Sequence, residues 1–394
     1  MASGISSTKE QAGHGSPFVS FSTVFNNYFL PDALPDLMDT SIKEQETYSI
    51  KEGDILITRT SETIDELAMS CVAVKDYPRA TYSGFTKRLR PKTAGIAYHK
   101  YLAFYLRSQL FRKAVTNNAF MTLRASFNED IFSFLNLYLP EYKEQVKIGD
   151  MLYSMEQKIQ LNKRICAELE AMAKTLYNYW FTQFDFPDEN GKPYCSSGGE
   201  MVWNDQLKRA IPKGWQVSSI GSVTRNYDSK RVPLSQNERD TMKGGIPYYG
   251  ATGIMDYVNR HIFDGQYVLI AEDGSVMDAK GNPIVQMIWG KTWVNNHAHV
   301  LQGCNGYSNE LLYLLLQHIP VVKIMTGSIQ KKINQDNLNS YKIPQIPDPI
   351  SQAFYEIVKP MFEKIQFLQA ENDELTKLRD WLLPVLMNGQ ATVE

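Results

Sequence analysis

Two stretches of equal length decide the fold: LYSMEQKIQLNKRICAELEAMAKTL, residues 152–176, and VKPMFEKIQFLQAENDELTKLRDWL, residues 358–382. In each stretch mostly apolar residues recur at alternating steps of three and four, the spacing of one buried helix face. Each seam position in the first stretch has a counterpart 206 residues later, as Leu152 has in Val358. The pattern therefore predicts two long helices, each of roughly 35 to 40 residues, with matching seams. The seam residues are Leu152, Met155, Ile159, Asn162, Cys166, Leu169, Ala173 and Leu176 in the first helix and Val358, Met361, Ile365, Leu368, Asn372, Leu375, Arg379 and Leu382 in the second.

A seam of this kind has to be buried against another helix. We favour antiparallel pairing of the two helices within one chain, because a globular segment between them lets the chain turn back. The alternative is a coiled coil with a second chain. The polar seam residues Asn162 and Asn372 are expected to fix register and orientation at some cost in stability. Further apolar residues beside the seams, such as Met172 and Leu378, predict a second surface for partner proteins.

The repeat extends upstream of the helices. Residues 50–58 resemble residues 262–270, residues 98–106 resemble 307–315, and residues 137–140 match 341–344. Short alternating strands mixed with one or two helices predict two α+β units separated by the long helices, which form an antiparallel coiled coil. The predicted boundaries are residues 1–140 for the first globular unit, 141–184 for the first long helix, 185–212 for a connector, 213–345 for the second globular unit and 346–394 for the second long helix.

Composition is that of a folded, soluble chain: 43% hydrophobic and 21% charged residues over 394 positions, with a formal charge of −2. There is no apolar run long enough for a membrane span, and the polar N-terminus predicts no signal peptide. The four cysteines are far apart, as expected for reduced thiols in the cytoplasm. His297 and His299 alternate as two residues on one strand face would, but no neighbouring carboxylate or cysteine cluster accompanies them. We therefore expect no metal site.

The near-neutral total hides an uneven distribution of charge. Residues 32–76 carry eleven acidic and four basic side chains, whereas residues 77–128 carry ten basic side chains and no acidic one. Aromatic residues are interleaved with these cations, which is typical of a surface that binds a polyanion. Residues 279–335 repeat the pattern weakly, with Glu310 as their only acidic residue. Some of the ten cations, such as Arg107 and Arg112, are equally well explained as solvated helix charges.

Side chains that bind phosphates or form paired hydrogen bonds with base edges are the candidates for DNA contact. They are Arg79, Tyr82, Lys87, Arg88, Arg90, Lys92 and Arg124 in the first globular unit and Lys291, Asn295, Asn296, His297, Gln330, Lys331 and Lys332 in the second.

Catalytic motifs are missing from the sequence. There is no GxxxxGK[ST], GxSxG or HExxH pattern, and Asn282-Pro283 lacks the second proline and the aromatic residue that an amino-methyltransferase uses to hold a flipped base. Glu272-Asp273 is better explained as a turn that ends a strand than as a metal-binding pair. We therefore predict no catalytic residues and a role in recognition.

Long stretches of the chain resemble the specificity subunits of type I restriction-modification systems. They include IPYYGATGIMDYVNRHIFDGQYVLIAEDGS, residues 246–275, and TGSIQKKINQDNLNSYKIPQIP, residues 326–347, together with residues 169–217. The resemblance covers essentially the whole chain and is weakest over residues 1–124. It implies two target recognition domains, each recognising one half of a split double-stranded DNA sequence, and two helices that act as a spacer and as a docking site.

The resemblance also implies the partners. Two modification subunits would bind S-adenosylmethionine and methylate adenine, and restriction subunits would add ATP- and Mg-dependent translocation and cleavage. This chain itself would hold no cofactor and would bind no membrane. The alternative is a standalone protein whose coiled coil homodimerises and whose basic surface binds nucleic acid without selectivity. Light scattering of the isolated chain distinguishes the two, because intramolecular pairing predicts a monomer near 45.0 kDa.

Overall fold

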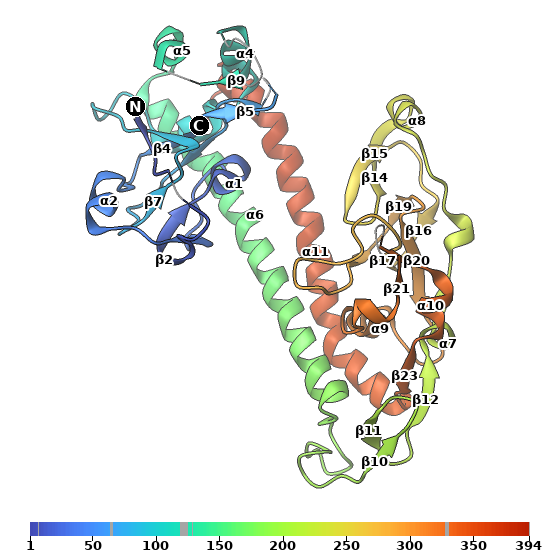
Figure 1. Cartoon of the computed structure of the whole chain (residues 1–394). Coiled ribbons are helices and arrows are strands. Elements are labelled where there is room, and N and C mark those ends of the chain that lie inside the picture. The colour runs from blue at the N-terminus through green and yellow to red at the C-terminus, as the bar shows by residue number, and fades with distance from the viewer. Residues whose placement is uncertain (7, 64–65, 119–124, 128, 328–330, 394) are drawn as a thin grey trace. The chain divides into compact units, whose positions relative to one another are not determined.

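The computed structural model describes residues 1–394 apart from 7, 64–65, 119–124, 128, 328–330 and 394 (Figure 1). The chain forms two compact units. Unit 1 comprises Met1–Asn162 and Glu371–Glu394, and unit 2 comprises Lys163–Ala370. The long helices α6 (Tyr142–Tyr177) and α11 (Asp348–Met387) each contribute one half to either unit. A π-helical turn, η2 (Asn178–Thr182), continues α6.

Within unit 1 the N-terminal half of α6 packs antiparallel to the C-terminal half of α11. Arg379 Nη1 donates to Glu156 Oε2 at 2.8 Å, and Asn162 Nδ2 donates to Asn372 Oδ1 at 2.9 Å. The partner on α11 moves toward the N-terminus as the residue on α6 moves toward the C-terminus, which defines an antiparallel pair. Asn162 is fully buried, so these polar contacts in the seam take the place of hydrogen bonds to water.

Within unit 2 the remaining halves of the two helices pair in the same sense. Cys166 Sγ lies 3.9 Å from the carbonyl oxygen of Ile365, and the rings of Tyr177 and Phe354 meet edge to face at 6.3 Å. The predicted intramolecular antiparallel pairing is thus confirmed in each unit. The fully buried seam residues are Leu152, Ile159, Asn162, Ala173, Val358, Ile365 and Leu368, and the partly buried ones are Met155, Cys166, Leu169, Leu176, Met361, Asn372, Leu375, Arg379 and Leu382.

Unit 1 contains nine strands among its described residues, and its main sheet has the order β1-β8-β4-β6. A second sheet, β3-β2-β7, pairs β2 antiparallel with β3 and parallel with β7. The strands are β1 (Ala2–Ser3), β2 (Ala12–Val19), β3 (Asp36–Met38), β4 (Ile55–Thr58), β5 (Thr60–Ser61), β6 (Ser70–Val72), β7 (Thr81–Tyr82), β8 (Thr86–Leu89) and β9 (Ala125–Ser126). The shorter helices are α1 (Phe21–Asn26), α2 (Ile42–Thr47), α3 (His99–Tyr105), α4 (Gln109–Asn118) and α5 (Glu129–Phe134).

Unit 2 contains a main sheet of order β13-β20-β17-β18 and a second sheet of order β15-β14-β19-β16. The strands are β10 (Met201–Asn204), β11 (Arg209–Pro212), β12 (Gln216–Ser219), β13 (Thr224–Asn226), β14 (Lys243–Tyr249), β15 (Ile254–Val258), β16 (Phe263–Asp264), β17 (Tyr267–Ala271), β18 (Val285–Ile288), β19 (Lys291–Val294), β20 (Ala298–Gly303), β21 (Met325–Thr326), β22 (Lys332–Ile333) and β23 (Lys342–Gln345). The shorter helices are α7 (Ile220–Val223), η3 (Asp228–Lys230), α8 (Gln236–Thr241), α9 (Asn309–Gln317), η4 (Val321–Lys323) and α10 (Gln335–Ser340).

The two units share one strand connectivity. In each, the central strand of the main sheet, β4 or β17, pairs antiparallel with two later strands, β6 and β8 or β18 and β20. In each second sheet a strand with a bulge, β2 or β14, runs parallel to the strand that precedes the main-sheet strand β8 or β20. The sequence repeat is therefore a repeat of topology as well as of helices.

The pairing of the strands corrects the alignment of the two sequence repeats in two places. The sequence aligns Thr58 with Ile270. In the structure Thr58 pairs with Thr86 and Ala271 pairs with Ala298. Thr58 is therefore equivalent to Ala271, a shift of one residue. Residues 342–345 form β23 paired with β12, whereas residues 137–140 form no strand. A one-residue slip reverses the face of every side chain in a strand, and only the pairing partner settles it.

The segment 185–212, for which the sequence predicts a connector, is packed and partly ordered into strands. It contains the hairpin β10–β11, and Phe186 and Ile211 lie in the apolar core of unit 2 together with α9 and the end of α6. Glycine and proline in this segment mark turns of a packed hairpin rather than a loose linker. Within the part of the chain that the structure describes, no helix has both the length and the apolarity needed to span a bilayer.

Candidate nucleic-acid interface

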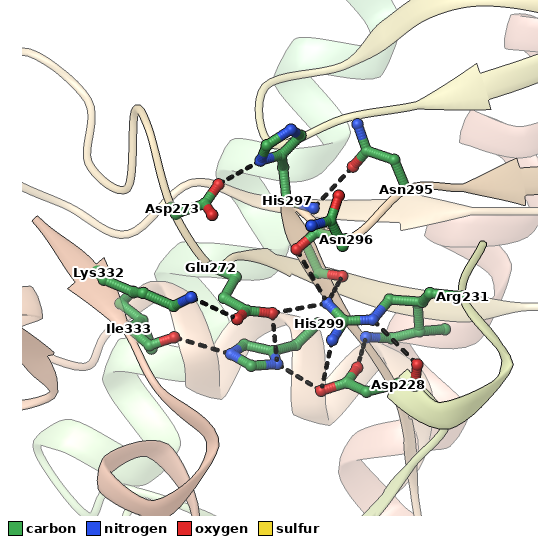
Figure 2. Close-up of polar contacts among 12 residues, drawn as sticks. Asp228, Arg231, Glu272, Asp273, Asn295, Asn296, His297, His299, Lys332 and Ile333 are labelled. Atoms are coloured by element: carbon green, nitrogen blue, oxygen red, sulfur yellow. Dashed lines mark hydrogen bonds and ion pairs between the residues drawn. The ribbon is translucent and has the colours of Figure 1, made fainter. Parts of the chain in front are cut away.

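A buried ionic network lies at the edge of the main sheet of unit 2 (Figure 2). His299 on β20 is 2% exposed, and its Nδ1 lies 2.5 Å from Asp228 Oδ2. Its other ring nitrogen, Nε2, lies 2.8 Å from the carbonyl oxygen of Ile333 on β22. Asp228 also accepts a hydrogen bond from the backbone amide of Val300 at 2.8 Å. The turn η3 is thereby attached to two strands of the unit.

Two further cations complete this network. Arg231 Nη1 donates to Glu272 Oε2 at 2.7 Å and to the carbonyl oxygen of Ala298 at 2.8 Å. Lys332 Nζ lies 3.1 Å from Glu272 Oε1. We call Asp228, Arg231, Glu272, His299 and Lys332 the unit 2 network. With His299 protonated it holds two carboxylates and three cations.

The pKa values follow from this geometry. Burial alone would lower the pKa of His299, but the hydrogen bond and charge of Asp228, the Ile333 carbonyl and the charge of Glu272 raise it above its ordinary value. Burial opposes ionisation of Asp228 too, yet His299 and the donors Asn226 and Val300 hold its pKa below the usual range. Burial likewise opposes ionisation of Glu272, and Arg231 and Lys332 lower its pKa. The ionic contacts therefore favour the charged form of all three groups.

Asp228, Glu272 and His299 bring three possible metal-ligand atoms within 4.8 Å of one another. The statement that no carboxylate accompanies the histidines was therefore wrong, because carboxylates distant in sequence surround His299. The donor set still does not suit a metal ion: Arg231 and Lys332 already bind the Glu272 carboxylate, and both ring nitrogens of His299 lie within hydrogen-bond distance of oxygen atoms of the chain. A cation would have to displace these positive groups.

The predicted contact residues Asn295, Asn296 and His297 form the turn between β19 and β20. Asn295 is buried, and its Oδ1 accepts the backbone amide of His297 at 2.8 Å, so it shapes the turn and does not face solvent. Asn296 and His297 are exposed, and the His297 ring pairs with Asp273. His297 and His299 were expected on one strand face; instead His297 precedes β20 and is exposed, while His299 is enclosed.

The remaining unit 2 candidates are at the ends of strands. Lys291 at the start of β19 is exposed, and Lys331 just before β22 is half-buried. Lys332 belongs to the network described above. Gln330 lies outside the described residues, as does Arg124 of unit 1.

Unit 1 has a corresponding site, because backbone hydrogen bonds repeat at equivalent positions. The amide of Arg59 donates to Phe85 O at 2.8 Å, and the amide of Glu272 donates to His297 O at 2.8 Å. The amide of Phe127 donates to Arg59 O at 2.7 Å, and that of Ile333 donates to Glu272 O at 2.8 Å. Arg59 is thus the counterpart of Glu272, and Phe85 is the counterpart of His297.

The same registers identify Lys87 as the counterpart of His299, because Lys87 pairs with Ile57 and His299 pairs with Ile270. No carboxylate of the described residues pairs with Lys87 or Arg59. Arg59 is exposed, Lys87 is half-buried, and the Phe85 side chain is 63% exposed. We call Arg59, Phe85 and Lys87 the unit 1 cluster.

Three other predicted residues of unit 1 have structural roles. Tyr82 is 0% exposed and lies in a core cluster, so the prediction that it contacts DNA is corrected: β7 pairs with β2 and turns this side chain inward. Arg90 binds the buried Asp54 through Nε and Nη2, both at 2.6 Å. Arg88 donates to the Ser49 carbonyl and lies over the Tyr82 ring. Arg79 and Lys92 are exposed and stay candidates.

Part of the basic run is committed to folding. Arg107 donates to four backbone carbonyl oxygens at 2.6 to 2.9 Å. Lys100 Nζ binds Asp150 Oδ1 on α6 at 2.8 Å. The run therefore supplies both contacts that stabilise the fold and surface charge. The alternative that Arg107 is a solvated helix charge is contradicted, because its guanidinium is bonded to backbone carbonyl groups.

The sequence search missed the network partners Asp228, Arg231 and Glu272 and the unit 1 residues Arg59 and Phe85. Glu272 and Arg59 share one signal, since each directly follows a buried apolar strand at the equivalent point of the repeat. Asp228 gives no local signal, because it is 71 residues from His299.

Comparison with known proteins relates this chain to one family. A family model described as "Type I restriction modification DNA specificity domain" matches residues 4–171 and 212–377. The MjaIX specificity subunit of Methanocaldococcus jannaschii is 25% identical over 91% of this chain and 82% of its own length. The HindI specificity subunit of Haemophilus influenzae is 22% identical over 95% of this chain and 94% of its own length.

A solved structure of the S subunit from M. genitalium aligns with a TM-score of 0.55 at 16% identity and covers 98% of this chain and 92% of that one, which supports the fold. The two family matches coincide with the two topological repeats and together span most of the chain. The chain therefore belongs to the type I restriction-modification DNA specificity family and is the non-catalytic DNA-recognition subunit of such a system.

Proposed function

We propose that unit 1 and unit 2 each recognise one half of a bipartite double-stranded DNA target. The observation that carries this proposal is the repeat of one strand connectivity with a polar or cationic cluster at the same place in each copy. A split target needs two equivalent recognition elements, and a chain with two copies of one fold supplies them.

In unit 1 we assign DNA contact to Arg59, Phe85 and Lys87, with Arg79 and Lys92 as outlying phosphate contacts. Arginine and lysine side chains without a carboxylate partner can neutralise phosphates, and an exposed phenylalanine can pack on a thymine methyl group or a base edge. The structural roles of Tyr82, Arg88 and Arg90 leave these three out of the assignment.

In unit 2 we assign DNA contact to Asn296, His297, Lys291 and Lys331. Asn296 and His297 are at the tip of the turn before β20, where side-chain amide and imidazole groups can bond to base edges. The unit 2 network lies directly behind this turn and fixes its backbone through the Arg231 bond to Ala298 O. Gln330 and Arg124 lie outside the described residues and stay candidates from sequence.

We further propose that two modification subunits dock on the helix pair. They would carry S-adenosylmethionine, and restriction subunits would bring ATP and Mg to the cytoplasmic complex, in defence against phage DNA. The helices offer exposed apolar side chains for docking: Trp381 is 67% exposed, and Leu378, three residues earlier on the same face of α11, is also exposed. Substitution Trp381→Ala is expected to weaken co-purification of the modification subunit without changing the fold.

The test is co-expression of the chain with its partner subunits, followed by methylation-sensitive sequencing of the host genome. The expected result is methylated adenine in one split motif. Changing Arg59, Phe85 and Lys87 together to alanine should relax the base preference in one half of that motif only. Loss of preference in both halves at once, or a genome without any methylated motif, would contradict the proposal.

A further inference from the structure

The surroundings of His299 determine its protonation state. The Asp228 carboxylate can only accept a hydrogen bond when ionised, and a backbone carbonyl such as that of Ile333 can only accept. Both ring nitrogens of His299 face such acceptors, at 2.5 Å and 2.8 Å. The ring therefore has to carry two protons, as an imidazolium, to satisfy both contacts. A neutral ring would lose one of these two buried hydrogen bonds and would set the lone pair of a ring nitrogen against an acceptor oxygen.

This imidazolium joins four segments of unit 2. It bonds to Asp228 in η3 and to Ile333 in β22, and its charge faces Glu272 after β17 at 3.6 Å. Arg231 contacts the same two carboxylate oxygens as the ring, Asp228 Oδ2 at 3.5 Å and Glu272 Oε2 at 2.7 Å, and Lys332 Nζ lies 3.1 Å from Glu272 Oε1. Of these segments, β20 directly follows the turn 295–297 and β22 directly follows Lys331. Their backbone positions are thus coupled to one proton.

We propose that His299 is a positioning residue for DNA recognition, and that its second proton has to be present for unit 2 to bind its half of the target with full affinity. This rests on the proposed function of unit 2. The proton contributes in two ways: it keeps the four segments in one arrangement, and it gives the network its net positive charge opposite the phosphates. Binding equilibria are reciprocal, so bound DNA has to lower the acid dissociation constant of His299 by the factor by which the proton raises DNA affinity, and the pKa rises by the logarithm of that factor.

The experiment uses the complex of the full chain with its modification subunits and a duplex carrying the methylated motif. DNA affinity is measured from about pH 6 to about pH 9, the range in which histidines titrate. In parallel, ¹⁵N-histidine NMR follows the ring protons of His299 in the full chain. The wild-type complex is expected to lose about tenfold in affinity as His299 loses its second proton, the cost of one lost buried hydrogen bond.

Three variants separate positioning from simple structural support. Asp228→Asn removes the charge that stabilises the imidazolium, so the pH midpoint of affinity loss should move lower. His299→Phe should bind weakly at every pH with no midpoint. His261→Gln, at an exposed histidine of the same unit, should keep the wild-type midpoint.

Equal midpoints in wild-type and Asp228→Asn, or unchanged affinity at a pH where NMR shows a neutral His299, would overturn the inference. Failure of the underlying function gives a different result, namely a wild-type complex that selects no sequence at any pH while His299 keeps both ring protons. A purely structural role predicts weaker folding of the variants with no shift in the midpoint.

Discussion

Unit 1 and unit 2 place different chemistry on the same scaffold. At two equivalent positions of the main sheet, unit 1 has Arg59 and Lys87 while unit 2 has Glu272 and His299. In unit 2 the charges are buried and paired with one another. In unit 1 the two cations have no carboxylate partner among the described residues.

This difference shows that the basic character of a segment and its capacity to bind a polyanion are separate properties. Paired cations such as Arg231, Arg90 and Arg107 fix the backbone, whereas unpaired cations such as Lys87 contribute to the surface potential. DNA binding by unit 1 is thus expected to depend more on contacts with charged phosphates, and DNA binding by unit 2 more on the shape of the turn 295–297. Each prediction below tests this contrast.

The largest effect is expected for Asp228→Ala. It leaves the buried His299 without the carboxylate to which it is hydrogen-bonded, while Arg231 keeps Glu272, and breaking such a buried pair costs about 3–5 kcal/mol. Hydrogen exchange should show unit 2 losing stability while unit 1 keeps its protection. Asp264→Ala, at an exposed carboxylate of the same unit, is the matched control. A change below about 1 kcal/mol, the range of surface pairs, would mean that the network does not hold unit 2 together.

Next comes Arg107→Gln in unit 1. The shorter side chain cannot reach the four carbonyl groups that the guanidinium binds, so we expect a loss of about 3 kcal/mol in the unfolding free energy of unit 1. Lys113→Gln on α4 is the control, since Lys113 is exposed. If Arg107→Gln lowers DNA affinity and leaves stability unchanged, Arg107 is a contact residue and its assignment to folding is wrong.

Smaller effects are expected for Arg59→Ala and Lys87→Ala. Each should weaken DNA binding of the complex by about tenfold or less and reduce the slope of log affinity against log salt by about one, as for the loss of one phosphate contact. The comparison variant in unit 2 is Lys332→Ala, which should change the slope less because Lys332 neutralises Glu272. Equal slopes for all three variants would remove the proposed contrast between the units.

The smallest effect concerns pH and stability. The pKa of His299 is raised in the folded state, so its contribution is complete below its unfolded value and is lost as pH rises through the folded pKa. Unit 2 should therefore lose stability on the alkaline side. In unit 1, burial lowers the pKa of His99, so unit 1 should lose stability on the acid side instead. Thermal unfolding across pH, resolved by hydrogen exchange, checks both signs.

The helices were predictable because their signal is local. Seam spacing in 152–176 and 358–382 predicts α6 and α11, and the matching seams predict that they pair within the chain. The resemblance of residues 246–275 and 326–347 predicted the family, which the family match confirms. The repeated topology was predicted from the alignment of the two halves of the sequence, apart from the one-residue shift in strand register.

The candidate site was predictable only in part. The turn 295–297 and Lys87 were found from residue type, but Tyr82 was assigned to the surface and Arg59 was missed. Alternation in a short strand does not reveal which face is buried, and the parallel pairing of β7 with β2 decides it for Tyr82. For the basic run, sequence gives the number of cations but not which carbonyl groups or carboxylates bind them.

The sequence by itself determined the two helices, their seams, the repeated units and the family, because helix periodicity and long similar stretches depend on residues near one another in the chain. Only the tertiary structure decided the register of the strands, the partners of each charge and the state of His299. Those depend on contacts between residues such as Asp228, His299 and Ile333, which strand pairing brings within hydrogen-bond distance from widely separated positions.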